Sequence, residues 1–393
     1  MTPVYPPGAA SRSVQRPALT ERLNRFWLRV TEGLELNQLW SQFEKDARSS
    51  YRLYSAELEK KEFEPATRRG RKVLQTAEQF FWAVIEKLTP ARRVLLLVAL
   101  VLLFLPQGGI SYKNSAGEVH VFDFDLHVWG GLTLLLLLVL EVADRVVMKR
   151  DLQIAREIQN WLLPNQPPAI SGVEIAFITR PANTVAGDYY DVFKRPDPDG
   201  HEEHYLIAVA DVAGKSVPAA MIMATFQASL RTLSVTRRAL PDLIAGMNQY
   251  ACSNSQGGLR FTTAFLAEYE PSSRTLSYVN AGHNAPMVCR KSGALERLDA
   301  GGLPIGIMAD AAYQSGSATL APGDWVVIFT DGVVEAVNTL GEEYGEQRLL
   351  AAIAGGSSMT PAELMRRIMT SLDVFVGNTP QHDDMTCLLL KAV

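Results

Sequence analysis

The chain has 393 residues, of which 47% are hydrophobic, and a formal net charge of −4. This length suits two or three domains, and the interspersed charges form no basic stripe that would engage nucleic acid. The three cysteines lie far apart without paired spacing, which argues against a disulfide framework or a zinc knuckle.

The first 90 residues are predicted to hold a disordered start and a cytoplasmic helical region. Residues 1–20 are rich in Pro, Ser and Ala, and they lack the continuous apolar core of a signal peptide. From residue 21 to 61, apolar side chains recur at three- and four-residue steps among charges, which indicates amphipathic helices. We assign no function to this region.

Two apolar stretches follow, residues 94–112 and 126–140, and neither contains Asp, Glu, Lys or Arg. They predict two transmembrane helices within residues 91–147, joined by a short external loop near 111–125. A buried helical hairpin is the alternative, because the densest apolar cores are shorter than the ~20 residues that usually span a bilayer.

Basic residues set the predicted orientation of this hairpin. They flank both apolar stretches, whereas the loop between them holds only Lys113. Because cationic flanks stay on the cytoplasmic side, both termini are expected inside. The predicted location is therefore the inner (cytoplasmic) membrane, crossed twice, with the large C-terminal domain in the cytoplasm.

A helical linker is predicted over residues 148–168. Val147, Ile154, Ile158, Trp161 and Leu162 fall on one helical face, and Pro164 stops the helix. This face could pair with a second copy to form a homodimer, or it could pack against its own domain. Two or three heptads do not distinguish these alternatives.

Residues 169–393 change to short strand-like runs bounded by Gly, Pro, Asn and Asp. Helical periodicity appears between groups of strands rather than after every strand, at residues 217–233, 240–253, 345–354 and 361–375. This arrangement predicts an α+β domain in which a two-sheet β-sandwich is flanked by helices.

Four aspartates stand at the ends of strand-like runs: Asp188, Asp211, Asp331 and Asp383. One such residue is usually a turn or cap residue, but four in one domain suggest a shared site. Carboxylates gathered in one cleft raise one another's pKa unless cations neutralise them, and hard oxygen ligands favour Mg²⁺ or Mn²⁺. Two such ions can activate a water and clamp a phosphoryl group for in-line displacement.

The segment from about residue 152 to 393 carries an ordered series of motifs: LLP, VAGDYYD, ADVAGKSVPAAMIM, FTTAFLAEYE, YVNAGHNAP, GLPIGI, LAPGDWVVIFTDGVVEA and DDMT. In this series it resembles the metal-dependent protein phosphatase (PPM) family, and most of all its stage II sporulation protein E type. The resemblance implies a phosphoserine or phosphothreonine phosphatase with two Mn²⁺ or Mg²⁺ ions. It also implies an anti-sigma-factor antagonist or a similar phosphoprotein as substrate.

The same resemblance assigns roles to residues. It implies that Asp211 bridges both metals. Asp331 and Asp383 are then expected to complete one metal site, and Asp188 and the Val212 carbonyl the other. Asp384 and Asp191 are expected to support these ligands. The helix predicted at 217–233 begins just after Val212, so a small shift of this helix could make or break the second metal site. Upstream segments would act on it through the linker.

Two departures from the family pattern matter. Asp211 is followed by Val212 and Ala213 rather than Gly-His, so no general-acid histidine carries over, and Ser216 stands where the branch commonly has Gly. His283 and His382 could donate a proton to the leaving alkoxide, although structural turn roles are expected for both.

Two other functions stay open from the sequence. A phosphatase-like signalling module without catalysis would be indicated by missing aspartates, and all four are present. A metal-dependent hydrolase of small phosphomonoesters or nucleotides is excluded by no motif.

Overall fold

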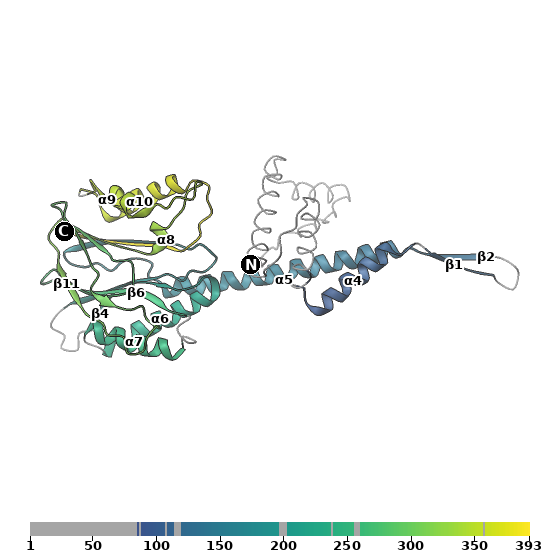
Figure 1. Ribbon diagram of the computed structural model, residues 1–393, viewed down its shortest axis with the longest axis horizontal. Helices are drawn as coiled ribbons and strands as arrows, with labels where there is room; N and C mark the ends of the chain where they lie inside the picture. The colour runs from purple at the N-terminus through teal and green to yellow at the C-terminus, as the bar shows by residue number, and fades with distance from the viewer. Residues whose placement is uncertain are drawn as a thin grey trace, which may run out of the picture. The chain divides into compact units, whose positions relative to one another are not determined.

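The computed structural model describes residues 85, 88–106, 108–113, 119–195, 203–236, 239–254, 260–356 and 358–393, with backbone alone between 108 and 124. The predicted N-terminal helical region therefore lies outside the described residues. The chain divides into two compact units, residues 1–141 and 142–393, which are described separately (Figure 1).

In the first unit, helix α4 (Pro90–Phe104) is followed by an antiparallel hairpin of β1 (Gly108–Lys113) and β2 (Val119–Phe124). The helix is shorter than the predicted apolar stretch of 94–112. Leu105 is already extended because Pro106 follows it, and a residue before proline avoids the helical region. The predicted external loop near 111–125 is consequently part of a β-hairpin.

Helix α5 (Leu126–Leu162) runs for 37 residues without a break, so the predicted second span and the predicted linker are one helix. Among the described residues it is the single helix that is long and apolar enough to cross a membrane. The 15 residues of α4 extend only about 22 Å, less than the ~30 Å hydrocarbon core. The two-helix membrane hairpin therefore stays a prediction.

The C-terminal half of α5 leaves its apolar stripe in solvent. Val147, Ile154, Ile158 and Trp161 are all exposed, Trp161 by 80%. The buried Gln159 joins this helix to the domain, because its side chain donates to the Ala186 carbonyl at 2.7 Å and accepts from the Ala186 N–H at 3.0 Å. The helix ends two residues before Pro164, as predicted, and apart from the half-buried Leu162 the stripe does not pack against its own domain.

The second unit is built on two β-sheets, and the strand order of the first is β10-β7-β6-β5-β4, with β11 also pairing with β7. Its strands are β4 (Tyr189–Arg195), β5 (His204–Val212), β6 (Thr262–Glu270), β7 (Thr275–Ala281), β10 (Gly301–Gly302) and β11 (Gly316–Thr319). The order of the second sheet is β3-β13-β12-β8-β9. Its strands are β3 (Val173–Arg180), β8 (Met287–Cys289), β9 (Leu295–Arg297), β12 (Trp325–Phe329) and β13 (Met385–Ala392).

Helices cover the outer faces of both sheets, as Figure 1 shows. Helices α6 (Ser216–Thr236) and α7 (Leu240–Asn254) pack on the first sheet, and α8 (Asp331–Val334), α9 (Gly345–Ile353) and α10 (Pro361–Val376) pack on the second. A third apolar core lies between the sheets and contains Val209, Phe265 and Leu388. The predicted α+β sandwich is confirmed.

Candidate active site

Antiparallel pairing brings the four predicted aspartates to one end of the sandwich. Asp188 immediately precedes β4, and Asp211 is the penultimate residue of β5, whose end pairs with the start of β4. Asp331 follows β12 and opens α8, while Asp383 lies just before β13, whose start pairs with the end of β12. Each sheet therefore contributes two carboxylates.

The electrostatics show that these carboxylates share one site. Burial, together with the charges of Asp331 and Asp383, raises the pKa of Asp211 to about 7, although a hydrogen bond with Asp188 opposes the rise. Burial, followed by the charge of Asp211, also raises the pKa of Asp188 well above its usual value. The pKa of Asp331 is raised by burial and by Asp383. Such mutual repulsion is what a bound cation would relieve.

Thr330 positions the most deeply buried of the four carboxylates. Its hydroxyl donates to Asp188 at 2.9 Å and accepts from the backbone N–H of Thr386 at the same distance. Asp188 is only 1% exposed. Thr330 is not among the residues predicted from the sequence, although its place directly before Asp331 was an available signal.

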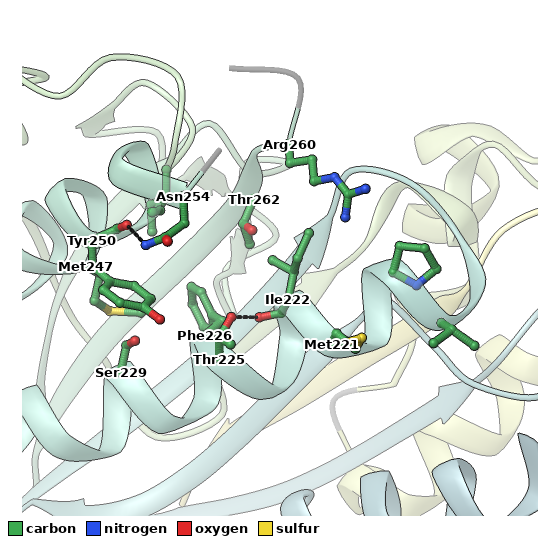
Figure 2. A pocket seen from close by; sticks show the side chains of 14 residues that line it. Met221, Ile222, Thr225, Phe226, Ser229, Met247, Tyr250, Asn254, Arg260 and Thr262 are labelled. Atoms are coloured by element: carbon green, nitrogen blue, oxygen red, sulfur yellow. Dashed lines mark hydrogen bonds between the residues drawn. The ribbon is translucent and has the colours of Figure 1, made fainter. Parts of the chain in front are cut away.

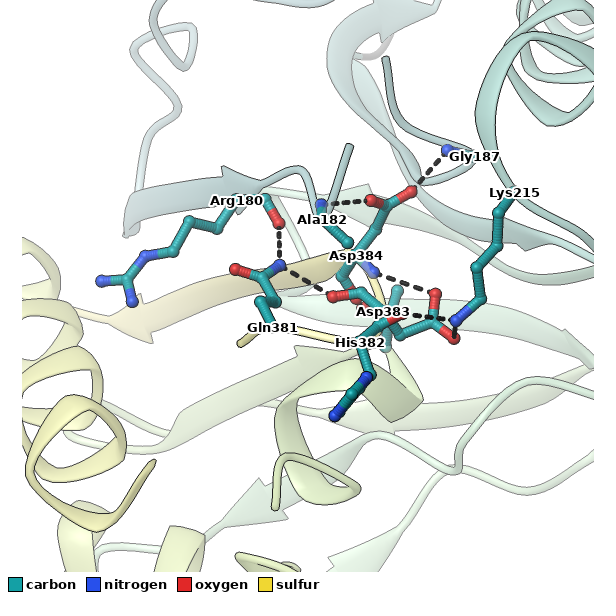
Figure 3. Close-up of polar contacts among 9 residues, drawn as sticks. Arg180, Ala182, Gly187, Lys215, Gln381, His382, Asp383 and Asp384 are labelled. Atoms are coloured by element: carbon teal, nitrogen blue, oxygen red, sulfur yellow. Dashed lines mark hydrogen bonds and ion pairs between the residues drawn. The ribbon is translucent and has the colours of Figure 1, made fainter. Parts of the chain in front are cut away.

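Asp384 holds the loop that leads to Asp188. Its carboxylate accepts the backbone N–H groups of Ala182 at 2.7 Å and Gly187 at 2.6 Å (Figure 3). Charge-assisted bonds of this kind are among the stronger ones in proteins. The supporting position predicted for Asp384 agrees with this geometry.

Lys215 pairs with the fourth aspartate. Its ammonium lies 2.9 Å from a carboxylate oxygen of Asp383 and also donates to the main-chain carbonyl of His382 (Figure 3). A small cavity of about 200 Å³ opens beside this pair and is also lined by Gly332 and Glu335. Lys215 is likewise absent from the site residues predicted from the sequence.

Tight backbone packing brings the ligand-bearing segments together. A Cβ atom on Gly332 would lie 2.0 Å from the Asp384 carbonyl oxygen, and one on Gly187 would lie 3.2 Å from the Val212 carbonyl oxygen. The Val212 carbonyl is thus next to the residue that precedes Asp188. Ser216 has a φ of 64°, the left-handed conformation that favours glycine, so a serine here holds a backbone conformation that glycine would adopt with less strain.

The remaining predicted residues lie outside the carboxylate cluster. His283 is buried, its Nδ1 lies 3.0 Å from the Thr263 hydroxyl, and burial lowers its pKa to about 4. The imidazole of His382 points away from Lys215 in Figure 3. Asp191 accepts bonds from Tyr189 and Arg231 and so ties β4 to α6 rather than serving the cluster.

Comparisons with known proteins agree with this architecture. A family model described as stage II sporulation protein E matches residues 201–393. The phosphoserine phosphatase RsbU of Bacillus subtilis is 30% identical over 247 residues, which cover 62% of this chain and 70% of RsbU. This chain belongs to the SpoIIE-type PPM phosphatase family.

Other relatives of this SpoIIE-type chain cover similar segments. Protein IcfG of Synechocystis is 28% identical over 275 residues, which are 63% of this chain but only 42% of IcfG. The solved SiaA-PP2C domain of Pseudomonas aeruginosa shares 24% identity with a TM-score of 0.55, and it covers 64% of this chain and 99% of that domain. The likeness to SiaA supports the fold alone.

The donor chemistry of the SpoIIE-type site fits the divalent ions that the family implies. Four carboxylates and one main-chain carbonyl are hard oxygen donors, and burial together with neighbouring carboxylates raises the pKa of Asp188, Asp211 and Asp331. No group of three or more His, Cys, Asp or Glu side chains among the described residues forms a ready-made ligand set. Asp383 in particular is turned toward Lys215. The metal-ligand roles of the individual residues stay a prediction.

Proposed function

We propose that this chain is a membrane-anchored serine/threonine protein phosphatase that acts on a cytosolic regulatory phosphoprotein. The observation that carries the proposal is the convergence of Asp188, Asp211, Asp331 and Asp383 at one end of the sandwich, where burial and the neighbouring carboxylates raise the pKa of the first three. The family membership and the name of RsbU, a phosphoserine phosphatase, support the same reaction.

In this proposal the aspartates at one end of the sandwich would hold two Mn²⁺ or Mg²⁺ ions. Asp211 would contact both, Asp331 and Asp383 would complete one site, and Asp188 with the Val212 carbonyl would complete the other. When bound, the ions supply Lewis-acid activation of the attacking water and neutralise phosphoryl charge. Thr330 and Asp384 hold the Asp188 segment in place, while Lys215 supplies a local positive charge beside Asp383.

The proposed reaction is tested by phosphate release from the full chain in lipid nanodiscs with Mn²⁺, with and without a chelator. Serine-phosphorylated regulatory proteins, including anti-sigma-factor antagonists, would be compared with nucleotide monophosphates. Chelator-sensitive turnover of the phosphoproteins is expected. Preference for nucleotides would favour the small-molecule phosphomonoesterase, and no turnover of any substrate would favour the non-catalytic module.

The anchoring proposal, with the phosphatase domain in the cytoplasm, rests on the exposed apolar surface of the first unit. Apolar side chains on α4 and on the first part of α5 are more than half exposed, including Val94, Phe104, Trp129 and Leu138. Burial in lipid would remove this surface from water. Retention of the chain in the membrane after alkaline carbonate extraction is expected, and its release into the soluble fraction would contradict the anchor.

The exposed stripe on the C-terminal half of α5 supports a homodimer through this helix. Ile154→Cys in two copies should form an intermolecular disulfide under mild oxidation, because both residues would face the seam. Arg156→Cys is the matched control on the other side of the helix. Equal crosslinking of the two variants would contradict a specific seam.

A further inference from the structure

A second cavity, separate from the aspartate cluster, lies between α6 and α7 (Figure 2). Its volume is about 510 Å³, within the range of clefts that hold small organic ligands. The apolar wall comes from both helices and from the strand region behind them, and includes Met221, Ile222, Phe226, Met247 and Ile305. Phe226, Met247 and Ile305 are buried and form the base of the cavity, whereas Met221 and Tyr250 at its rim are exposed.

One cation stands at the edge of this apolar cavity. Arg260 lines it, and Figure 2 shows its side chain extending above Ile222. Within the described part of the chain, Arg260 has no hydrogen-bond or ion-pair partner. Two polar side chains in the lining already have partners, because Thr225 donates to the Ile222 carbonyl and Asn254 donates to the Tyr250 carbonyl.

The cavity also shares walls with the loop that carries the proposed metal ligands. Val217 and Pro218, in the first turn of α6, line one end and follow Lys215 and Ser216 directly. On the opposite wall, Arg260 and Thr262 flank Phe261, whose carbonyl accepts the backbone N–H of Ala213 at 2.9 Å. Ala213 is the residue after Val212, so both walls continue into the loop between β5 and α6.

We propose that this cavity is an effector site for a small amphiphile that has an apolar body and one anionic head group. The apolar body lies between α6 and α7, where burial of its surface drives binding. The head group pairs with Arg260, whose planar guanidinium matches a carboxylate in two parallel hydrogen bonds. A bound ligand contacts the first turn of α6 and thereby alters the Asp211–Lys215 loop; this coupling rests on the proposed phosphatase function, whereas the binding does not.

Equilibrium dialysis of the full chain in lipid nanodiscs tests the binding, with octanoate as the probe and octanol as its neutral counterpart. Octanoate should bind saturably, and Arg260→Gln should weaken octanoate binding by about tenfold while leaving octanol binding unchanged. Arg260→Lys should restore part of the octanoate affinity. Thr225→Trp should fill the cavity and abolish binding of both probes. Ala228→Trp, at an exposed position on the same helix that does not line the cavity, should not.

The outcomes separate the binding site from the reaction. Equal affinity for octanoate and octanol, or identical octanoate binding by wild type and Arg260→Gln, would overturn the anionic ligand and leave a purely apolar occupant such as a partner helix. If octanoate binds as expected, it should also change Mn²⁺-dependent phosphate release at least twofold in wild type but not in Arg260→Gln. Saturable binding with unchanged turnover in an active enzyme would overturn the effector role. An enzyme that is inactive under every condition would count against the proposed function and leave the binding result standing.

Discussion

Asp384→Asn should loosen the loop that carries Asp188. The carboxylate of Asp384 accepts two backbone N–H groups, from Ala182 and Gly187, and it is only 7% exposed. An asparagine amide keeps one acceptor oxygen but turns its NH₂ group toward the other N–H, so one charge-assisted bond is lost and one donor is left without a partner. The expected cost is about 2–3 kcal/mol.

An opposing effect must be weighed against this loss. The negative charge of Asp384 also raises the pKa of Asp188 and Asp211, so its removal relieves some repulsion in the metal-free protein. In both residues burial contributes more than this charge to the raised pKa. The lost hydrogen bond should therefore dominate, and the loop should open more often.

Hydrogen exchange of the Ala182 and Gly187 amides, followed by mass spectrometry on the full chain, measures the loop directly. A cost of 2–3 kcal/mol corresponds to exchange that is about 30- to 150-fold faster. Asp373→Asn is the matched control, because its ion pair with Arg180 lies at the surface and is worth at most about 1 kcal/mol. Wild-type exchange rates in Asp384→Asn would refute the role of this carboxylate.

Three further perturbations test other parts of the site. The pKa of Asp211 is raised to about 7, so near neutral pH the folded metal-free chain holds a proton that the unfolded chain has released. The protonated Asp211 stabilises the fold fully below about pH 4, and this contribution is lost as the pH rises through 7. The urea midpoint in EDTA should therefore fall from pH 5 to pH 8, and a rise would contradict the assignment. Ser216→Gly should stabilise the fold by about 0.5–1 kcal/mol, because glycine adopts the φ of 64° at this position without strain. Ala228→Gly, within α6, should instead destabilise the fold. Thermal midpoints measure both, and a lower midpoint for Ser216→Gly would contradict the strain assigned to Ser216. Lys215→Gln removes an ion pair of half-exposed groups, so calorimetric titration should show Mn²⁺ binding up to about fivefold tighter; weaker binding would mean that Lys215 supports the metal site.

The sequence predicted the sandwich because its strands and helices have clear local patterns. The apolar run before Asp331 became β12, and the periodic segment from 361 to 375 became α10, which carries a capping box at Thr360 and Glu363. The four aspartates were found because each stands beside a turn signal at the end of a strand. Antiparallel pairing then placed them at one end of the fold.

Other features depend on contacts between distant segments and had no local signal. The hydrogen bonds from Ala182 and Gly187 to Asp384 connect residues about 200 positions apart, and the Lys215–Asp383 pair spans a similar separation. The cavity between α6 and α7 arises from the packing of these two helices. The sequence of each helix shows only an ordinary amphipathic pattern, which does not predict a cavity. The predicted apolar stretch of 94–112 is longer than α4 because its composition stays apolar past Pro106, whereas the proline ends the helix at Phe104.

The most direct test of the whole account is Mn²⁺-dependent phosphate release by Asp211→Asn on a phosphoserine protein, beside wild type and the surface control Asp373→Asn. Replacing the carboxylate proposed to contact both ions should lower turnover at least ~100-fold, while Asp373→Asn stays near wild type. Turnover by Asp211→Asn within a few-fold of wild type, at the same Mn²⁺ concentration, would contradict a shared metal site at these four aspartates.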